Sequence, residues 1–158
     1  MEKLGKTSVN LKEFQESDLE EFYRIAKNKG VKKFVRIFYP EDMEEAKMIL
    51  DMLRDTTNYI SFKILDEDNR IVGGIVGDKI GRGKIDVSYF IGEEYRKNGF
   101  CTQAVSLFEQ YLKEKSKITT MQFYVARDNK RSQNVMKRLS IKLDHKTNTG
   151  IIFEKEIS

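Results

Sequence analysis

FIGEEYRKNGFCTQAVSLFEQYL, residues 90–112, joins two patterns that are typical of different secondary structures. An apolar run of the kind found in strands comes first, and apolar residues at helical spacing follow soon after Gly99. Arg96, Lys97 and Asn98 form a short polar turn between the two patterns. The stretch therefore predicts a strand that leads almost directly into a helix, with basic side chains and a glycine at the junction.

The start of a helix is a favourable place for a phosphate group. Its first backbone N–H groups lack helical partners and carry partial positive charge. Gly99 has no Cβ, so a phosphate can come close to the backbone or the loop can adopt a positive φ. Arg96 and Lys97 add side-chain charge. A plain strand–helix turn with solvated basic side chains has the same features, so the residues alone leave both interpretations open.

The sequence on either side of this junction predicts an α+β domain. Residues 9–14 form a weak first strand, and Pro40 is predicted to open the second helix. Alternating apolar residues predict strands at residues 59–65, 71–76, 85–91 and 121–125, and a closing hairpin at 141–144 and 150–157. Ser17 and Asp18 offer an N-cap, and helical spacing predicts helices at about residues 19–26, 40–53, 102–115 and 132–139. Helices combined with a largely antiparallel sheet define the α+β class.

Chain length and cysteine content bound the organisation of the protein. A chain of 158 residues is long enough to bury a core without disulfides or a structural metal, and we expect one domain over residues 1–158. The single cysteine, Cys101, cannot form an internal disulfide and fits a reducing compartment. The first residues lack the apolar segment of a secretory signal, and no apolar run approaches the ~20 residues of a membrane span. We therefore expect a cytoplasmic protein with no membrane partner.

The charges of the chain permit an anionic ligand but do not favour nucleic acid. The sequence has 29 Lys and Arg against 25 Asp and Glu, a formal net charge of +4. Nucleic-acid-binding proteins usually gather their basic residues on one stripe, with aromatic residues between them. Here both signs mix throughout, as in EEAKMILDMLRD, residues 44–55. Nucleic-acid binding is therefore not expected.

Two motifs give the chain a family resemblance. RKNGFC, residues 96–101, resembles the pyrophosphate-binding motif of the GNAT superfamily of acetyl-CoA-dependent N-acetyltransferases: Gln or Arg, two variable residues, Gly, one variable residue, then Gly or Ala. The longer run IDVSYFIGEEYRKNGFCTQA, residues 85–104, is similar to the branch that contains the ribosomal-protein N-terminal acetyltransferases. DNKRSQNVMKRL, residues 128–139, resembles the same branch. The resemblance extends over about residues 60–143.

This resemblance implies a fold, a cosubstrate and a set of binding residues. The fold is a single GNAT-like domain, with a mixed, mostly antiparallel sheet flanked by helices. The resemblance further implies acetyl-CoA as the cosubstrate and a primary amine as the acceptor. The resemblance assigns acetyl-CoA contacts to Phe90, Ile91, Arg96, Lys97, Asn98, Gly99, Phe100, Cys101, Thr102 and Asn129. Backbone groups near Phe90 and Ile91 are expected to hold the pantetheine arm and to polarise the thioester.

Acetyl transfer to an amine requires that the amine lose its proton, and a nearby carboxylate can accept it directly or through water. Asp86 is our candidate for this general base. It lies in the predicted strand before the junction, where alternation places it on one face with Ser88 and Phe90, opposite Val87 and Tyr89. It also aligns with a glutamate of the family. A solvated acid at a strand edge is an equally open interpretation.

Three residues depart from the family pattern. Cys101 stands where the motif has Gly or Ala, Ser140 stands where a glycine usually follows the second helix, and Met136 stands where many members carry a tyrosine that protonates the leaving thiolate. Ser132 is therefore the candidate acid, because it resembles the hydroxyl that in this branch lies near the CoA sulfur. Asn129 resembles the residue that hydrogen-bonds the pantetheine. Helix capping is the alternative role for both Ser132 and Asn129.

Cys101 has two open interpretations. A thiol at a helix N-terminus can have a lowered pKa and act as a transient acyl carrier. The simpler interpretation is a small residue in a tight turn. The lone histidine, His145, lies in the closing hairpin, and one histidine with one cysteine supplies neither a metal site nor a Ser/His/Asp triad.

We therefore predict an N-acetyltransferase that moves an acetyl group from acetyl-CoA to a primary amine, either a protein N-terminus or a small molecule. An acyl-CoA-binding module with a regulatory role and little turnover is the alternative, because position 136 lacks the usual tyrosine. The acceptor pocket is expected to draw on the helices of residues 19–53, where the match to the family is weakest. The sequence does not decide between a monomer and a homodimer.

Overall fold

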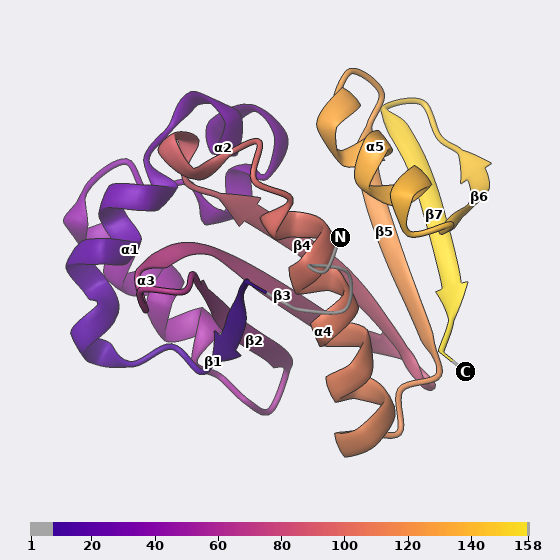
Figure 1. Cartoon of the computed structure of the whole chain (residues 1–158), viewed down its shortest axis with the longest axis horizontal. Coiled ribbons are helices and arrows are strands. Elements are labelled where there is room, and N and C mark those ends of the chain that lie inside the picture. The colour runs from indigo at the N-terminus through magenta and orange to yellow at the C-terminus, as the bar shows by residue number, and fades with distance from the viewer. Residues whose placement is uncertain (1–7, 158) are drawn as a thin grey trace.

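Residues 8–157, the part of the chain that the computed structural model describes, form one seven-stranded sheet in the order β1-β2-β3-β4-β5-β7-β6 (Figure 1). The strands are β1 Asn10–Lys12, β2 Tyr59–Leu65, β3 Ile71–Gly81, β4 Lys84–Ile91, β5 Thr120–Ala126, β6 Lys142–Lys146 and β7 Gly150–Glu156. Neighbouring strands of this sheet are antiparallel except β4 and β5, which are parallel. The mixed, mostly antiparallel sheet confirms the predicted arrangement.

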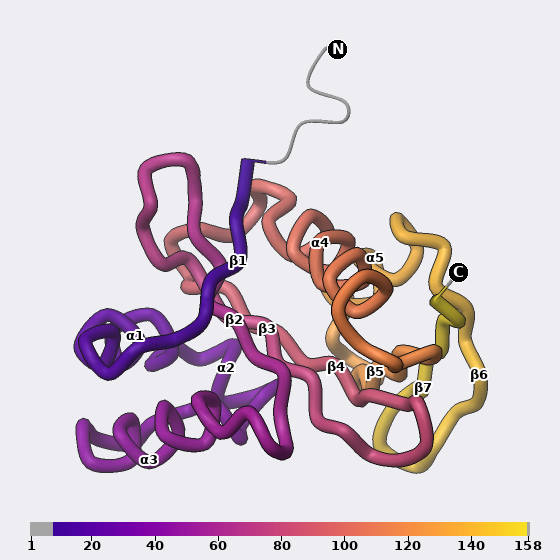
Figure 2. Tube along the Cα trace, turned by 90° about the horizontal axis from the view of Figure 1, so that it is seen from below, coloured from indigo at the N-terminus to yellow at the C-terminus, as the bar shows by residue number. Residues whose placement is uncertain are grey.

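Helices cover both faces of the sheet (Figure 2). The helices are α1 Leu19–Ala26, α2 Lys29–Phe34, α3 Met43–Leu53, α4 Phe100–Lys115 and α5 Lys130–Arg138, with short 3-10 turns at Glu16–Asp18, Arg36–Phe38 and Glu93–Tyr95. α1, α2 and α3 pack on one face, and α4 and α5 pack on the other. The α+β class is confirmed. None of the helices in residues 8–157 is long and apolar enough to cross a membrane.

β4 is held by a hydrophobic core on each side. Successive side chains of a strand point to opposite faces, so Ile85 and Val87 are buried against α4, next to Phe108. Phe90 is buried on the other face, where its ring meets that of Phe22 edge-on at 6.0 Å between centroids. A buried phenylalanine of this kind typically stabilises a fold by about 3–5 kcal/mol relative to alanine. The strand before the junction is therefore fixed in position by both layers of helices.

β4 and β5 separate halfway along their length. They pair only at Lys84 with Thr120, Ile85 with Met121 and Asp86 with Gln122. Beyond that point β4 continues along β3 as far as Ile91, while β5 continues along β7 as far as Ala126. The two strands diverge in Figure 1, and the gap between them opens beside the start of α4. Residues of both strands beyond this point, among them Ser88 and Val125, line one cavity, so the end of the β4–β5 pairing coincides with a cleft between the strands.

Some predicted helix boundaries are wrong. The sequence predicts no helix at residues 29–34, where α2 forms. Pro40 precedes α3 instead of opening it, because Asp42 caps that helix by accepting the N–H of Glu45 at 2.9 Å. α4 and α5 each begin two residues earlier than predicted, since their N-caps are Gly99 and Asn129.

The bounds of two predicted strands and one predicted helix cap also differ from the structure. β1 covers only Asn10–Lys12 of the expected residues 9–14, and β3 continues past residue 76 to Gly81 because its later residues still pair with β4. Asp18 makes no capping bond to α1; its carboxylate accepts the N–H of Gln15 and forms a buried ion pair with Lys63 at 2.9 Å. The expectation about a signal segment partly concerns residues 1–7, which lie outside the described residues.

Candidate active site

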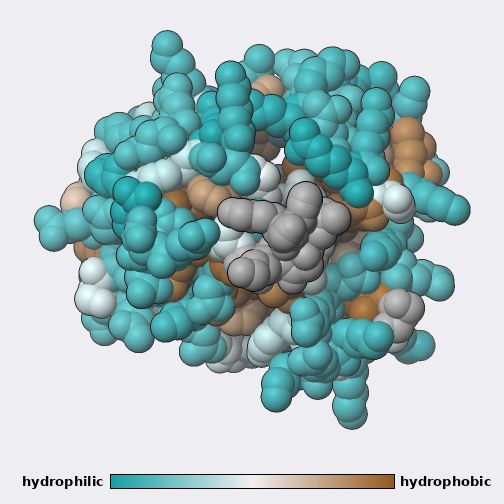
Figure 3. Space-filling view, viewed as in Figure 1, coloured by the Kyte–Doolittle hydropathy of each residue, from teal (hydrophilic) through white to brown (hydrophobic). Residues whose placement is uncertain are grey.

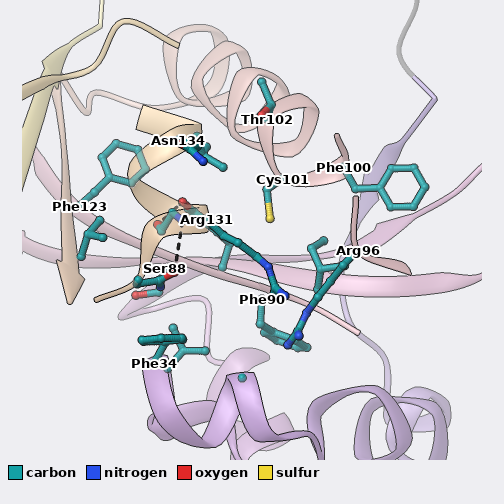
Figure 4. Close-up of a pocket in the computed structure, with 18 of the residues that line it drawn as sticks. Phe34, Ser88, Phe90, Arg96, Phe100, Cys101, Thr102, Phe123, Arg131 and Asn134 are labelled. Atoms are coloured by element: carbon teal, nitrogen blue, oxygen red, sulfur yellow. Dashed lines mark hydrogen bonds between the residues drawn. The ribbon is translucent and has the colours of Figure 1, made fainter. Parts of the chain in front are cut away.

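A cavity of about 330 Å³ lies where β4 and β5 have separated, within the size range of small-molecule sites. Its walls come from α2 on one side and from the start of α4 and the inner face of α5 on the other, with β4 and β5 between them. In the space-filling view, apolar residues appear at the edge of a hollow in an otherwise hydrophilic face (Figure 3). Figure 4 shows the side chains that converge on this space.

The loop before α4 presents backbone N–H groups to the cavity. Gly99 is the N-cap of α4 with φ +73°, and its carbonyl accepts the N–H of Gln103. In helical geometry the N–H groups of Phe100, Cys101 and Thr102 therefore have no partner within the helix. Thr102 also has a buried Oγ1 with no hydrogen-bond partner among the described residues. A phosphate or another oxygen-rich group at this point would satisfy these donors.

Two arginines extend into the same region. Arg96 donates to the Asn28 side chain at 3.0 Å and lies against Gly30, where any Cβ would be 2.1 Å from a guanidinium nitrogen. Arg131 extends from α5 toward Arg96 across the cavity (Figure 4). Burial, followed by the positive charge of Arg131, lowers the pKa of Arg96. Neither guanidinium forms an ion pair with another residue in the described part of the chain.

The charge of the cavity wall has one sign. Its charged lining residues are Arg96, Lys97, Arg131 and Arg138, and no Asp or Glu of the described residues lines it. Arg96 is the one of the four that is partly buried, whereas Lys97, Arg131 and Arg138 are exposed. Like charges gathered on one wall repel one another, and an anion bound between them relieves this repulsion. The wall is therefore suited to a ligand with several negative charges, such as the diphosphate of a coenzyme.

A pair of hydroxyl groups lies at the β4–α5 side of the cavity. Tyr89 of β4 and Ser132 of α5 bring their oxygens to 2.5 Å, and burial raises the pKa of Tyr89. Asn129 caps α5 by accepting the N–H of Ser132 at 3.2 Å, which confirms the capping interpretation for Asn129. Met136 is fully buried in the core and supplies no hydroxyl. Hydroxyl groups thus enter the cavity from β4 and from the first turn of α5.

The family model for the acetyltransferase (GNAT) domain matches residues 8–142. The chain belongs to the GNAT family. This confirms the resemblance of the two motifs, and the matched residues run from before β1 into β6.

Similar proteins include enzymes that act on very different amines. A spermidine N-acetyltransferase from Vibrio cholerae, solved with CoA and spermine, has a TM-score of 0.83 at 12% identity, covering 95% of this chain and 96% of that chain. RimL, a ribosomal L7/L12 α-N-protein acetyltransferase, has a TM-score of 0.85 at 16% identity, and the match covers 96% of this chain and 92% of that chain. These likenesses show the fold, and the second is in line with the branch that the motifs resemble.

A curated relative in Bacillus subtilis (strain 168) is named an uncharacterized N-acetyltransferase, YjdG. It is 26% identical over 95 residues, or 58% of this chain. The match spans 56% of the relative, about half its length.

Most residues that the GNAT motifs assign to acetyl-CoA line the cavity. Asn98 is the exception: its side-chain amide donates to the carbonyls of Tyr95 and Arg96 and so stabilises the loop from outside. The lining residues are Phe90, Ile91, Arg96, Lys97, Gly99, Phe100, Cys101, Thr102 and Asn129. Ser132 lines it as well.

Asp86 lies just outside the cavity. It forms the last β4–β5 pair with Gln122, whose side-chain amide donates to its carboxylate at 3.1 Å. Burial, together with the negative charge of Asp78 opposite it on β3, raises the pKa of Asp86. Ser88, two residues further along the same face of β4, does line the cavity. Asp86 therefore lies at the closed end of the cleft, two residues or ~7 Å along β4 from Ser88 in the cavity wall. Its role as the base stays a prediction.

Cys101 is a protonated thiol in the cavity wall. Burial raises its pKa to about 12, and the positive charges of Arg96 and Arg131 only partly oppose this. At neutral pH it therefore carries no nucleophilic thiolate, which agrees with the small-residue interpretation. No group of three or more His, Cys, Asp or Glu side chains within residues 8–157 is placed to hold a metal ion.

α2 is the part of the site that sequence analysis missed. An apolar wall of the cavity is formed by Val31 and Phe34 of α2 and by Val35, which directly follows the helix. The available signal was Asn28, whose side chain accepts the N–H of Val31 at 3.0 Å and caps the helix. This wall lies within the N-terminal helices from which the acceptor pocket was expected.

Proposed function

We propose that the protein is an acetyl-CoA-dependent N-acetyltransferase that acts on a primary amine in the cytoplasm. The observation that carries this proposal is the start of α4. Phe100, Cys101 and Thr102, which begin α4, line one cavity together with Arg96 and Arg131, and the described lining of this cavity contains no carboxylate. The Thr102 hydroxyl is buried and has no partner among the described residues. These groups fit the diphosphate of acetyl-CoA, and membership of the GNAT family supports the assignment.

The separation of β4 from β5 supports the placement of the thioester. Beyond Asp86, β4 pairs with β3 on one side only. In such a strand, alternate residues direct backbone N–H and C=O groups away from the paired neighbour. These groups near Phe90 and Ile91 therefore face the gap, where they are suited to hold the pantetheine amides and the thioester oxygen.

The acceptor amine is proposed to enter between this strand and α2. Positioning both substrates in one cavity supplies a large part of the rate. Asp86 is proposed to take the proton of the amine, through water in view of its distance from the wall. Ser132 is proposed to lie beside the sulfur that leaves.

The test is a titration of the protein with acetyl-CoA by calorimetry, followed by assays of CoA release with a panel of amines. The proposal expects saturable binding and CoA release with at least one amine. Binding without CoA release from any amine would favour the regulatory module instead. An absence of binding would overturn both.

The charge of the cavity predicts which amines are accepted. The acceptor is proposed to enter beside α2, which carries Lys29, Lys32 and Lys33 and no acidic residue, so a polyamine would bring further positive charge to this basic helix. We expect kcat/KM for a peptide N-terminus followed by acidic residues to exceed that for spermidine at least ~10-fold, or ~1.4 kcal/mol. A peptide with the same first residue followed by lysines is the matched control and is expected to react more slowly than the acidic peptide. Equal or higher kcat/KM for spermidine would contradict this prediction.

A further inference from the structure

The Tyr89–Ser132 hydroxyl pair is a second feature of the cavity, and its role follows from counting protons. The two oxygens are 2.5 Å apart, and neither has another hydrogen-bond partner among the described residues. Each hydroxyl carries one proton, and their mutual bond uses one of the two. One proton is therefore left without an acceptor, and Ser132, which lines the cavity and is only 9% exposed, lies where that proton can point inward.

The direction of the bond follows from the acidity of the two groups. A phenol is more acidic than an alcohol and is the better donor, so Tyr89 donates to the Ser132 oxygen. Burial raises the pKa of Tyr89, which keeps the phenol protonated at neutral pH. In this arrangement the Ser132 proton is the one that remains for a ligand.

The same acidities argue against transfer of that proton. A thiol has an ordinary pKa of about 8.5 and a tyrosine one of about 10. Burial raises the pKa of Tyr89 further above that of the thiol. The hydroxyl pair therefore holds its protons more tightly than a CoA thiolate would. It can donate a strong hydrogen bond to the sulfur without acting as an acid.

We propose that Tyr89 is a positioning residue that orients the Ser132 hydroxyl as a hydrogen-bond donor to the leaving thiolate; this inference rests on the proposed acetyl transfer. As the amine attacks, the C–N bond forms, the C–S bond breaks and the sulfur takes the electron pair. The proton of the amine goes to the base, both hydroxyls keep theirs, and the thiolate takes its proton from solvent afterwards. The pair thus stabilises the thiolate by hydrogen bonding alone, whereas the tyrosine that position 136 lacks would protonate it.

The sharpest test measures the pKa of the CoA thiol in its complex with the protein, from the ultraviolet absorbance of the thiolate. Donation from Ser132 stabilises the thiolate, so the bound thiol is expected to have a pKa about one unit lower in the wild type than in Tyr89→Phe or Ser132→Ala. Cys101, with its pKa of about 12, does not titrate in the same range. Tyr111→Phe removes a partly exposed phenol of α4 that does not line the cavity, and it keeps the ring that packs edge-on against Phe62. It is the control and should match the wild type.

Kinetics supply a second measurement. Tyr89→Phe removes one oxygen and keeps the ring, so it is expected to lower kcat about 10-fold with little change in KM for acetyl-CoA, and Ser132→Ala should do the same. The double variant should be no worse than Ser132→Ala within about twofold, because the two residues act through one hydrogen bond. A wild-type thiol pKa and wild-type kcat in Tyr89→Phe would overturn the inference. A wild type that binds CoA but releases none from acetyl-CoA with any amine would instead overturn the proposed function, and the thiol measurement, which needs only CoA binding, separates the two failures.

Discussion

An Asp86→Asn variant is expected to lose about 100-fold in kcat/KM for the amine acceptor while keeping its affinity for acetyl-CoA. This loss is the low end of what a general base contributes. The affinity should persist because Asp86 lies outside the cavity wall. Asparagine retains the oxygen that accepts the Gln122 amide at 3.1 Å, so the local structure should survive. Steady-state kinetics with the amine varied, beside calorimetry with acetyl-CoA, measures both quantities.

The dependence of kcat/KM on pH should also differ between the wild type and Asp86→Asn. The pKa of Asp86 is raised above its ordinary value, so in the wild type kcat/KM should fall as the pH drops through that raised pKa and the base becomes protonated. In Asp86→Asn that dependence should disappear. Its activity should recover partly at alkaline pH, where more of the amine is already neutral, since the pKa is about 8 for a peptide N-terminus and about 10.4 for a lysine-like amine. Full activity of the variant from about pH 6.5 to 9 would show that Asp86 is not the base.

Stability offers a readout that does not depend on the acceptor. A carboxyl group with a raised pKa in the folded state contributes stability below its unfolded pKa, here 3.8, and loses that contribution as the pH rises through the folded pKa. When Asp86 is ionised, the wild type therefore carries an unfavourable, half-buried negative charge opposite that of Asp78. Asp86→Asn should melt at a higher temperature than the wild type at pH 7, and this difference should shrink toward acidic pH. Asp78 lies on the exposed part of β3, and Asp78→Asn should lower the pKa of Asp86 because it removes the neighbouring negative charge. The fall of kcat/KM on the acidic side of the pH profile should then occur at a lower pH.

The parts of the site that sequence predicts are those encoded by neighbouring residues. The loop before α4 is one contiguous segment, and the order of a strand, a glycine and an apolar helical pattern determines where its N–H groups point. The strands were predictable for a similar reason, since β2 and β4 alternate apolar residues with a period of two. Membership of the GNAT family was carried by the same segments.

The parts that sequence does not predict depend on tertiary structure. α2 has only six residues, and Val31 is its one buried side chain, so no apolar periodicity marks it. Tyr89 and Ser132 are 43 residues apart, and their contact depends on how α5 packs against β4. The point at which β4 and β5 separate places Asp86 outside the cavity, although its alternation with Ser88 is as predicted. No local pattern records where two strands stop pairing.

A Gly99→Val variant is expected to weaken acetyl-CoA binding by more than ~10-fold, or ~1.4 kcal/mol, while the fold survives. The reason is the backbone rather than a collision: a Cβ at Gly99 would meet nothing closer than a Gln103 nitrogen at 3.9 Å, but φ is +73°. A β-branched residue strongly disfavours that conformation. The loop is therefore expected to rotate and turn the N–H groups of Phe100 and Cys101 away from the diphosphate. Calorimetric titration with acetyl-CoA measures the loss.

Gly83 supplies the matched control for this prediction. It has a similar φ of +66° in the turn between β3 and β4, and it does not line the cavity of the proposed active site. Gly83→Val should lower the melting temperature, because it adds backbone strain and a close approach to Thr119, yet leave acetyl-CoA affinity unchanged.

Thr102→Val tests the same anion site without backbone strain. The change keeps the shape of the side chain and removes only the buried oxygen, which has no partner among the described residues. If that oxygen binds acetyl-CoA, the variant should bind acetyl-CoA more weakly and melt at a higher temperature, because an unsatisfied buried hydroxyl costs free energy in the unliganded protein. Wild-type affinity in both Gly99→Val and Thr102→Val would mean that the start of α4 does not hold the diphosphate.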